Sequence, residues 1–196
     1  LHPQISFQDT GPFQAVRAVL PLIGMEIPAF AGQSRSKVRD FLVVLPETAI
    51  PRMLDQVDPA YLDELQGLMR ARGADLLLGV PFRDGAGRYY NGVANIGASP
   101  LQFYAKSHLV PLGEFVPAEF RWIVSWLKIP LSDFSHGDLQ QPMQSAGERV
   151  ALTVCYEDAF GEELIRQLPQ ASLLANLSNV AWFGDSLAPG QHLQMS

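Results

Sequence analysis

The chain of 196 residues has little cysteine, a modest share of charge and no long apolar run. Its single cysteine, Cys155, excludes an internal disulfide framework. No stretch reaches the ~18–20 apolar residues that a membrane-spanning helix needs. Lys and Arg total 14 against 20 acidic residues, and no basic cluster occurs, so a nucleic-acid surface is not expected. A hydrophobic share of 47% predicts a globular domain with a sizeable core.

Recognisable metal and phosphate motifs are missing as well. His108, His136 and His192 do not follow a zinc-ligand spacing, and a single cysteine argues further against zinc. Neither a phosphate-binding glycine loop nor a Gly-x-Ser-x-Gly motif occurs. The sequence therefore predicts a site without a metal ion.

What is present is an alternation of apolar, strand-like runs and amphipathic helices, which is typical of a layered α/β fold. We expect strands within residues 41–47, 74–82, 87–98, 101–110, 149–157 and 171–179. We expect helices at 58–73, 117–129 and 161–169. Asn91-Gly92 predicts a hairpin turn, with Asp84-Gly85 as the alternative. Near-continuous apolar strands indicate sheets covered on both faces.

Three chemically capable residues each follow an apolar strand. Glu47 ends the first run, Lys106 ends the run that begins at residue 101, and Cys155 ends the run that begins at residue 149. A thiolate is a good nucleophile, a carboxylate can take its proton, and a lysine can stabilise an oxyanion. Glu114 is a second carboxylate that could hold the lysine or assist proton transfer. Such a group would catalyse acyl transfer through a thioester.

Structural explanations exist for the same residues. A lone cysteine after an apolar strand is most often an inert core residue. Glu47 and Lys106 could be ordinary solvated charges in loops. A pairing of Cys155 with His108 is also open on sequence alone, although nothing in the spacing requires it.

Several longer stretches carry a resemblance. The stretches "LPETAIP", "KSHLVPLGEFVP", "LTVCYEDAFGE" and "NLSNVAWFGDSLAPGQHLQM" together resemble the nitrilase-like domain of bacterial apolipoprotein N-acyltransferases. This family lies within the carbon–nitrogen hydrolase (nitrilase) superfamily. The resemblance implies a four-layer α-β-β-α sandwich, incomplete in this chain. It divides the chain into residues 1–36, of uncertain origin, and a catalytic domain over 37–196 that is truncated at its C-terminal end.

The resemblance also assigns roles to the residues. Glu47 would be the general base, Lys106 the oxyanion stabiliser and Cys155 the nucleophile. Glu114, Tyr156 and Glu157 would assist.

Aromatic residues that the resemblance places near the site could bind substrate. They are Phe115, Trp122, Trp126, Trp182 and Phe183. Two tryptophans within residues 117–129 exceed what one buried face needs, so this segment could face lipid. These side chains could equally be ordinary packing.

The implied reaction moves a fatty-acyl chain from a phospholipid to Cys155 and then to the α-amino group of a diacylglyceryl-cysteine on an apolipoprotein, without a cofactor. The parent protein would lie in the bacterial inner membrane, with this domain facing the periplasm. One alternative is a soluble amidase of the nitrilase superfamily that uses the same residues on a small amide. Another is a non-catalytic fragment that binds lipid or lipoprotein. The sequence leaves the phospholipid, the lipoprotein range and the oligomeric state open.

Overall fold

The computed structural model describes residues 41–111, 113–116, 133–180, 184 and 186–195. The N-terminal segment 1–36 and the expected helix at 117–129 lie outside the described residues. Four of the aromatic candidates lie outside them as well: Trp122, Trp126, Trp182 and Phe183.

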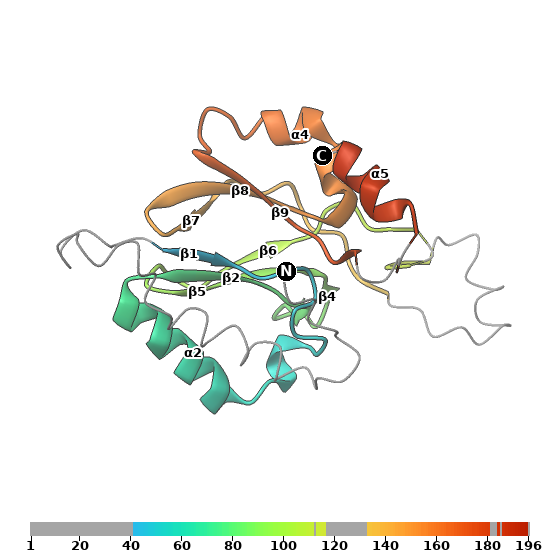
Figure 1. Ribbon diagram of the computed structural model, residues 1–196. Coiled ribbons are helices and arrows are strands. Elements are labelled where there is room, and N and C mark those ends of the chain that lie inside the picture. Colours follow the sequence, from blue (N-terminus) through green and yellow to red (C-terminus); the bar gives the residue numbers. More distant parts are fainter. Residues whose placement is uncertain (1–40, 112, 117–132, 181–183, 185, 196) are drawn as a thin grey trace, which may run out of the picture.

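Two β-sheets stack face to face, and helices cover their outer faces (Figure 1). The first sheet has the order β1-β2-β5-β6 and contains β1 (Leu42–Val44), β2 (Asp75–Gly79), β5 (Gly92–Gly97) and β6 (Gln102–Ala105). The second has the order β7-β8-β9 and contains β7 (Met143–Ser145), β8 (Glu148–Val154) and β9 (Leu173–Leu177). Helix α2 (Pro59–Arg72) covers the first sheet, and α4 (Gly161–Ile165) and α5 (Ala188–Met195) cover the second. This is the predicted α-β-β-α sandwich in an incomplete form.

The alternation of side chains along β2 explains why two apolar layers form. Leu76 and Leu78 point toward α2 and pack with its inward face, which includes Leu65 and Met69. Leu77 points the other way and joins the layer between the two sheets. The remaining members of that layer are Val93, Tyr104, Met143, Val150, Leu152, Val154 and Leu177. Because β2 is buried on both faces, its sequence is apolar throughout apart from its first and last residues.

Helix α2 begins and ends where the sequence predicts. The Asp58 carboxylate accepts a hydrogen bond from Ala60 N, and Pro59 occupies the first helical position. Gly73 ends the helix in the left-handed conformation, with φ of 63°. Among its apolar residues Leu65 and Met69 are buried, and Tyr61, Leu62 and Leu68 pack beside them.

The hairpin turn lies at the alternative position. Strands β3 (Phe82–Arg83) and β4 (Tyr89–Tyr90) pair in antiparallel fashion around residues 84–88. The Asp84 carboxylate closes this turn by accepting hydrogen bonds from Ala86 N and Arg88 N. The first-choice turn at Asn91-Gly92 is wrong, because Asn91 connects β4 directly to β5 and its carbonyl accepts the Lys106 N–H.

A buried carboxylate joins the two sheets at the N-terminal end of β2. Asp75 is fully buried and accepts hydrogen bonds from Ser99 N at 2.8 Å, from Ser99 Oγ, and from Ala146 N at 2.6 Å. Ala146 lies in the turn between β7 and β8, so this side chain fixes one sheet against the other.

We therefore expect Asp75→Ala to lower the free energy of unfolding by about 2–4 kcal/mol, because it leaves buried N–H groups unpaired. Chemical denaturation checks this value. Asp63→Ala, on the exposed face of α2, serves as the control and should have little effect. Equal effects of the two substitutions would contradict the inter-sheet role.

Candidate active site

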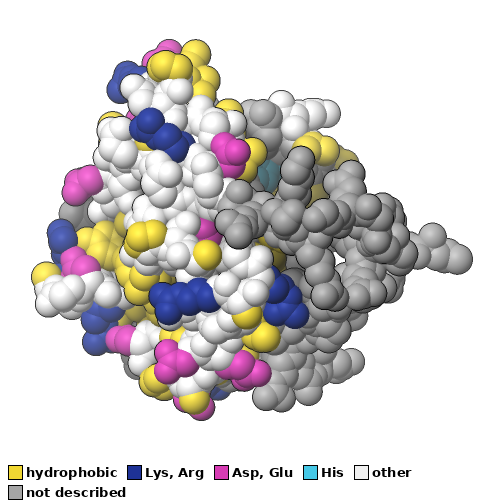
Figure 2. Space-filling model, turned by 90° about the vertical axis from the view of Figure 1, so that its left-hand side faces the viewer, with side chains coloured by type: hydrophobic (Ala, Val, Ile, Leu, Met, Phe, Trp, Pro, Cys, Tyr) yellow, Lys and Arg dark blue, Asp and Glu magenta, His cyan; other side chains and the backbone are white. Residues whose placement is uncertain are grey.

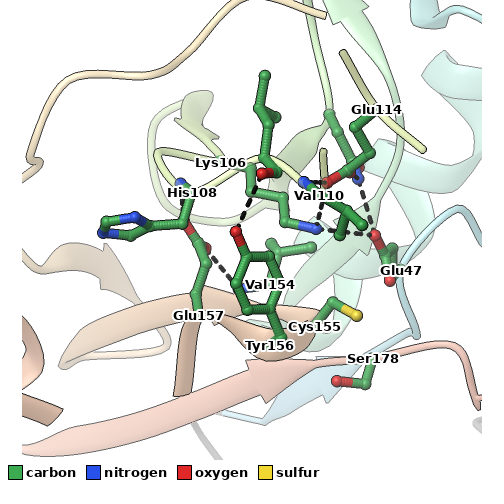
Figure 3. Close-up of polar contacts among 12 residues, drawn as sticks. Glu47, Lys106, His108, Val110, Glu114, Val154, Cys155, Tyr156, Glu157 and Ser178 are labelled. Atoms are coloured by element: carbon green, nitrogen blue, oxygen red, sulfur yellow. Dashed lines mark hydrogen bonds and ion pairs between the residues drawn. The ribbon is translucent and has the colours of Figure 1, made fainter. Parts of the chain in front are cut away.

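The Lys106 side chain lies in the interior with two carboxylates around its amine. It is 1% exposed, and Nζ lies 2.8 Å from Glu114 Oε2 and 3.6 Å from Glu47 Oε1. Figure 3 shows the amine between these carboxylates, with Cys155 and Tyr156 below it in the view. Nζ also lies 5.5 Å from the centre of the Tyr156 ring, within cation–π range. The predicted Glu47, Lys106 and Glu114 therefore meet, although 67 residues separate the first from the last (114 minus 47).

Burial and charge act in opposite directions on this lysine. Burial by itself lowers the pKa of Lys106, while the negative charges of Glu47 and Glu114 raise it. The net result is a pKa above the usual value, so the amine stays protonated at neutral pH. A fixed cation in a dry site is what an oxyanion stabiliser requires.

Asn91 connects the two carboxylates and was not predicted as a site residue. Its Nδ2 donates to Glu47 Oε1 at 2.7 Å and to Glu114 Oε1. Its carbonyl accepts from Lys106 N at 2.8 Å. Because Asn-Gly is typical of a turn, the sequence did not indicate that the Asn91 amide contacts two glutamates. Its burial, which makes hydrogen-bond partners necessary, is seen only in the structure.

Cys155 lies at a sharp turn where β8 changes into the short 3-10 helix η4 (Cys155–Ala159). Its φ is 56°, a conformation that residues other than glycine rarely adopt. Strained backbone of this kind often occurs at functional sites. The thiol is half-buried, and it interacts electrostatically with Glu47, Lys106 and Glu114. Cys155 packs against the layer between the sheets, and it also lies within electrostatic reach of three charged side chains, which an inert core cysteine does not require.

The resting thiol is protonated at neutral pH. Burial raises the pKa of Cys155 to about 11, and the charge of Glu47 contributes in the same direction. Lys106 and the backbone N–H of Tyr156 lower the pKa but do not outweigh these two. A nearby base is therefore needed to take the proton as the sulfur attacks.

Glu157 connects the loop that begins at Lys106 (the lysine loop) to the turn at Cys155 (the cysteine turn). It is 3% exposed, and its carboxylate accepts from backbone N–H groups of both segments: Val154 N at 2.7 Å, Ser107 N at 2.7 Å and His108 N at 3.0 Å. Two hydroxyl groups also donate to it, Ser107 Oγ and Tyr104 Oη, each at 2.9 Å. The carboxylate itself lies among these donors rather than beside the thiol, which suits a role in positioning.

The remaining predicted residues are placed as follows. The Tyr156 hydroxyl donates to Leu109 O at 3.0 Å, and its ring lies against Lys106. Phe115 is partly buried and meets the His136 ring edge-on at 5.1 Å between ring centres. His108 pairs with Glu163 at 2.8 Å and stacks on Phe160, so its ring is engaged away from the thiol.

No group of three or more metal-ligating side chains comes together in the part of the chain that the structure describes. No helix within the described ranges is long and apolar enough to span a membrane. On the face shown in Figure 2, basic side chains are scattered among acidic and apolar ones.

If the site transfers an acyl group, as the sequence resemblance implies, Asn91→Asp should lower that rate about 100-fold, because it replaces the shared amide donor of Glu47 and Glu114 by a third carboxylate. Steady-state kinetics of acyl transfer checks this. Asn95→Asp is the matched control, because Asn95 is also buried but lies farther along β5 and accepts a hydrogen bond from Ser145. The control should change stability rather than the rate constant of the folded enzyme. An equal loss of rate in both variants would contradict the role of Asn91.

Known proteins resemble this chain in sequence and in fold. The sequence model of the family described as carbon-nitrogen hydrolase matches residues 39–196. Curated relatives include the apolipoprotein N-acyltransferases of Nitrosomonas europaea, 52% identical, and Chromobacterium violaceum, 47% identical. Each match covers 79% of this chain, and the chain spans 32% and 31% of the two relatives' lengths.

Solved structures show the same fold. The NitFhit protein of C. elegans superposes with a TM-score of 0.56 at 21% identity, covering 85% of this chain and 40% of that one. An amidase from Nesterenkonia sp. gives a TM-score of 0.56 at 21% identity, covering 93% of this chain and 65% of that one. The chain thus belongs to the carbon–nitrogen hydrolase family, and its curated relatives at 41–52% identity are named apolipoprotein N-acyltransferases or, in one case, a putative one.

Proposed function

We propose that this chain is the catalytic domain of an apolipoprotein N-acyltransferase and works through a Cys155 thioester. The observation that carries the proposal is the arrangement around Lys106. A buried, protonated amine lies between two carboxylates, and a cysteine on a strained turn interacts with all three groups. The similarity to curated N-acyltransferases supports acyl transfer among the reactions that such a site can perform.

In the first half-reaction, the Cys155 thiol gives its proton to Glu47 as the sulfur attacks the ester carbonyl of a phospholipid. Lys106 stabilises the oxyanion, together with the backbone N–H next to the cysteine. When the C–O bond breaks, the proton passes from Glu47 to the lysophospholipid alkoxide. The acyl chain is then held on sulfur as a thioester.

In the second half-reaction, the α-amino group of a diacylglyceryl-cysteine attacks the thioester. Glu47 accepts the amine proton, the C–S bond breaks, and the thiol is regenerated by that proton. Both steps conserve atoms and protons with no further reactant. In this proposal Glu114 holds Lys106 and Glu157 positions the two loops. Because both proposed substrates are lipids or lipoproteins, the expected location of the parent protein is the bacterial inner membrane, with this domain on the periplasmic side.

The intact mass of the purified chain after incubation with phospholipid in detergent tests the first half-reaction. We expect a gain of one fatty-acyl unit that hydroxylamine removes and that Cys155→Ala abolishes. The full-length Nitrosomonas relative controls for the lipid preparation. A gain that persists in Cys155→Ala would contradict the thioester, as would no gain while the control is acylated. Lipid-independent amide hydrolysis would favour an amidase, and lipid binding without acylation would favour a binding fragment.

A further inference from the structure

A short segment covers the outer side of the loop that carries Lys106. We call residues 134–140 the strap. It supplies hydrogen bonds to three successive carbonyl groups at the end of β6: Gln140 Nε2 reaches Ala105 O at 2.8 Å, Gly137 N reaches Lys106 O at 2.8 Å, and His136 Nδ1 reaches Ser107 O at 3.0 Å. Among the described strands β6 lies at the edge of its sheet, so no described strand pairs with these carbonyls on that side.

The strap also contacts the segments that carry the other members of the site. Phe134 N donates to Glu114 O at 2.9 Å, and Ser135 N donates to Tyr89 O at 2.6 Å, just before Asn91. Its contacts therefore reach the lysine and glutamate loops as well as β4.

The backbone of Lys106 is consequently fixed on both sides. Its N–H donates inward to Asn91 O at 2.8 Å, and its carbonyl accepts outward from Gly137 N at the same distance. The side chain then extends to the two carboxylates. Because the amine has so little free space at 1% exposure, a shift of the backbone at Lys106 moves the charge itself.

Only glycine fits at position 137. A Cβ on Gly137 would lie 2.2 Å from Ala105 O and 2.7 Å from Ala105 C, which are backbone atoms and cannot rotate away. Any larger residue must push the strap away from β6 and lengthen the bond to Lys106 O. The strap can therefore bind Lys106 O only because residue 137 has no side chain.

We propose that the strap is a positioning element for Lys106, with Gly137 as its critical residue, and that it acts on Cys155 through the lysine charge. The inference rests on the proposed function of Lys106 and Cys155. Neither Gly137 nor Gln140 touches a reacting group, so both would be positioning residues. The strap would keep the cation where it can stabilise negative charge on the thiolate and on the oxyanion.

The experiment measures the rate of Cys155 alkylation by iodoacetamide from neutral to alkaline pH in the full chain. Charged groups that act on the thiol are Glu47, Lys106 and Glu114. In Gly137→Ala the lysine should withdraw, and alkylation at a given pH should slow about tenfold, as one pKa unit requires. Gly67→Ala is the matched control, because a Cβ there meets nothing within 4 Å. It should leave the alkylation profile unchanged.

A double-mutant cycle separates positioning from general structural damage. With Lys106→Gln as the background, Gly137→Ala should cause no further slowing, because the charge through which it acts is gone. Equal slowing in both backgrounds would overturn the proposal, as would no slowing with Lys106 present. Gln140→Leu removes one strap bond without a backbone clash, and it should show the same dependence on Lys106 if Gly137→Ala does not fold.

This readout is independent of acyl transfer. If Cys155→Ala still acylates its substrate, the proposed function fails, but the alkylation cycle still reports whether the strap sets the position of the Lys106 charge. If acyl transfer through Cys155 is found and the cycle shows no coupling, the function stands and the role of the strap is rejected.

Discussion

Replacement of Cys155 by serine is expected to abolish acyl transfer, with a loss on the order of 10⁴-fold or more. The fall has a direct cause. A serine hydroxyl is far less acidic than a thiol and needs a stronger general base such as an imidazole. The groups around position 155 are instead an amine, Lys106, and two carboxylates, Glu47 and Glu114. The measurement is the rate of acyl transfer from phospholipid, together with the intact mass for any acyl-enzyme.

Two controls make the serine result interpretable. Thermal unfolding should show that Cys155→Ser is folded, because the new side chain is nearly the same size and the position is only half-buried. Cys155→Ala should be equally inactive if the side-chain nucleophile is essential. Substantial acyl transfer by either variant would remove the thioester mechanism.

Replacement of Glu47 by glutamine is expected to change two rates in opposite directions. Acyl transfer should fall by about 10²–10⁴-fold, because the attacking thiol loses its general base. Alkylation of the resting thiol should become faster. The negative charge of Glu47 helps to raise the pKa of Cys155 toward about 11, so its removal lowers that pKa and increases the thiolate fraction.

Sequence reasoning alone predicts slower alkylation in Glu47→Gln, since a carboxylate near a thiol suggests a base that keeps the thiol deprotonated. The buried surroundings of Cys155 alter this, because in them the carboxylate charge opposes a second negative charge. Iodoacetamide kinetics over a range of pH decides between the two. Glu64→Gln, on the exposed face of α2, is the control and should alter neither rate. A parallel fall of both rates would support the simpler base model.

The same pKa predicts a pH effect on stability. The folded protein holds the Cys155 proton more tightly than the unfolded chain, whose thiol has a pKa of ~8.5. The stabilisation from this group is fully present below the unfolded pKa and is lost as the pH rises through about 11. Cys155→Ala should therefore flatten the alkaline decline of the free energy of unfolding, which denaturant titrations at several pH values would detect.

Local signals in the sequence determined much of the fold. The caps at Asp58 and Gly73 set the limits of α2. They satisfy backbone N–H and C=O groups that are unpaired at the helix ends, whatever the helix packs against. Apolar runs predicted the major strands, since a strand buried on both faces must be apolar along its length. The ends of those runs also identified Glu47, Lys106 and Cys155 as candidates, and the structure brings the first two into an ion pair.

Tertiary contacts decided what local signals left open. Asn91-Gly92 has the composition of a turn, yet it continues into β5, because the Asn91 amide is needed by two carboxylates that are distant in sequence. Glu157 was expected to assist, but its five donors from three segments exist only once the lysine loop meets the cysteine turn.

The contacts of the strap could not be predicted from the sequence either. The sequence of residues 134–140 does not indicate which segment they contact. Their hydrogen bonds go to the backbone carbonyls of Ala105, Lys106 and Ser107, and every residue has such a carbonyl. Sequence by itself determined the major strands, helix α2 and the candidates Glu47, Lys106 and Cys155. The tertiary structure decided the charge state of the thiol and lysine, because desolvation and the distance between charges arise only when the two sheets pack.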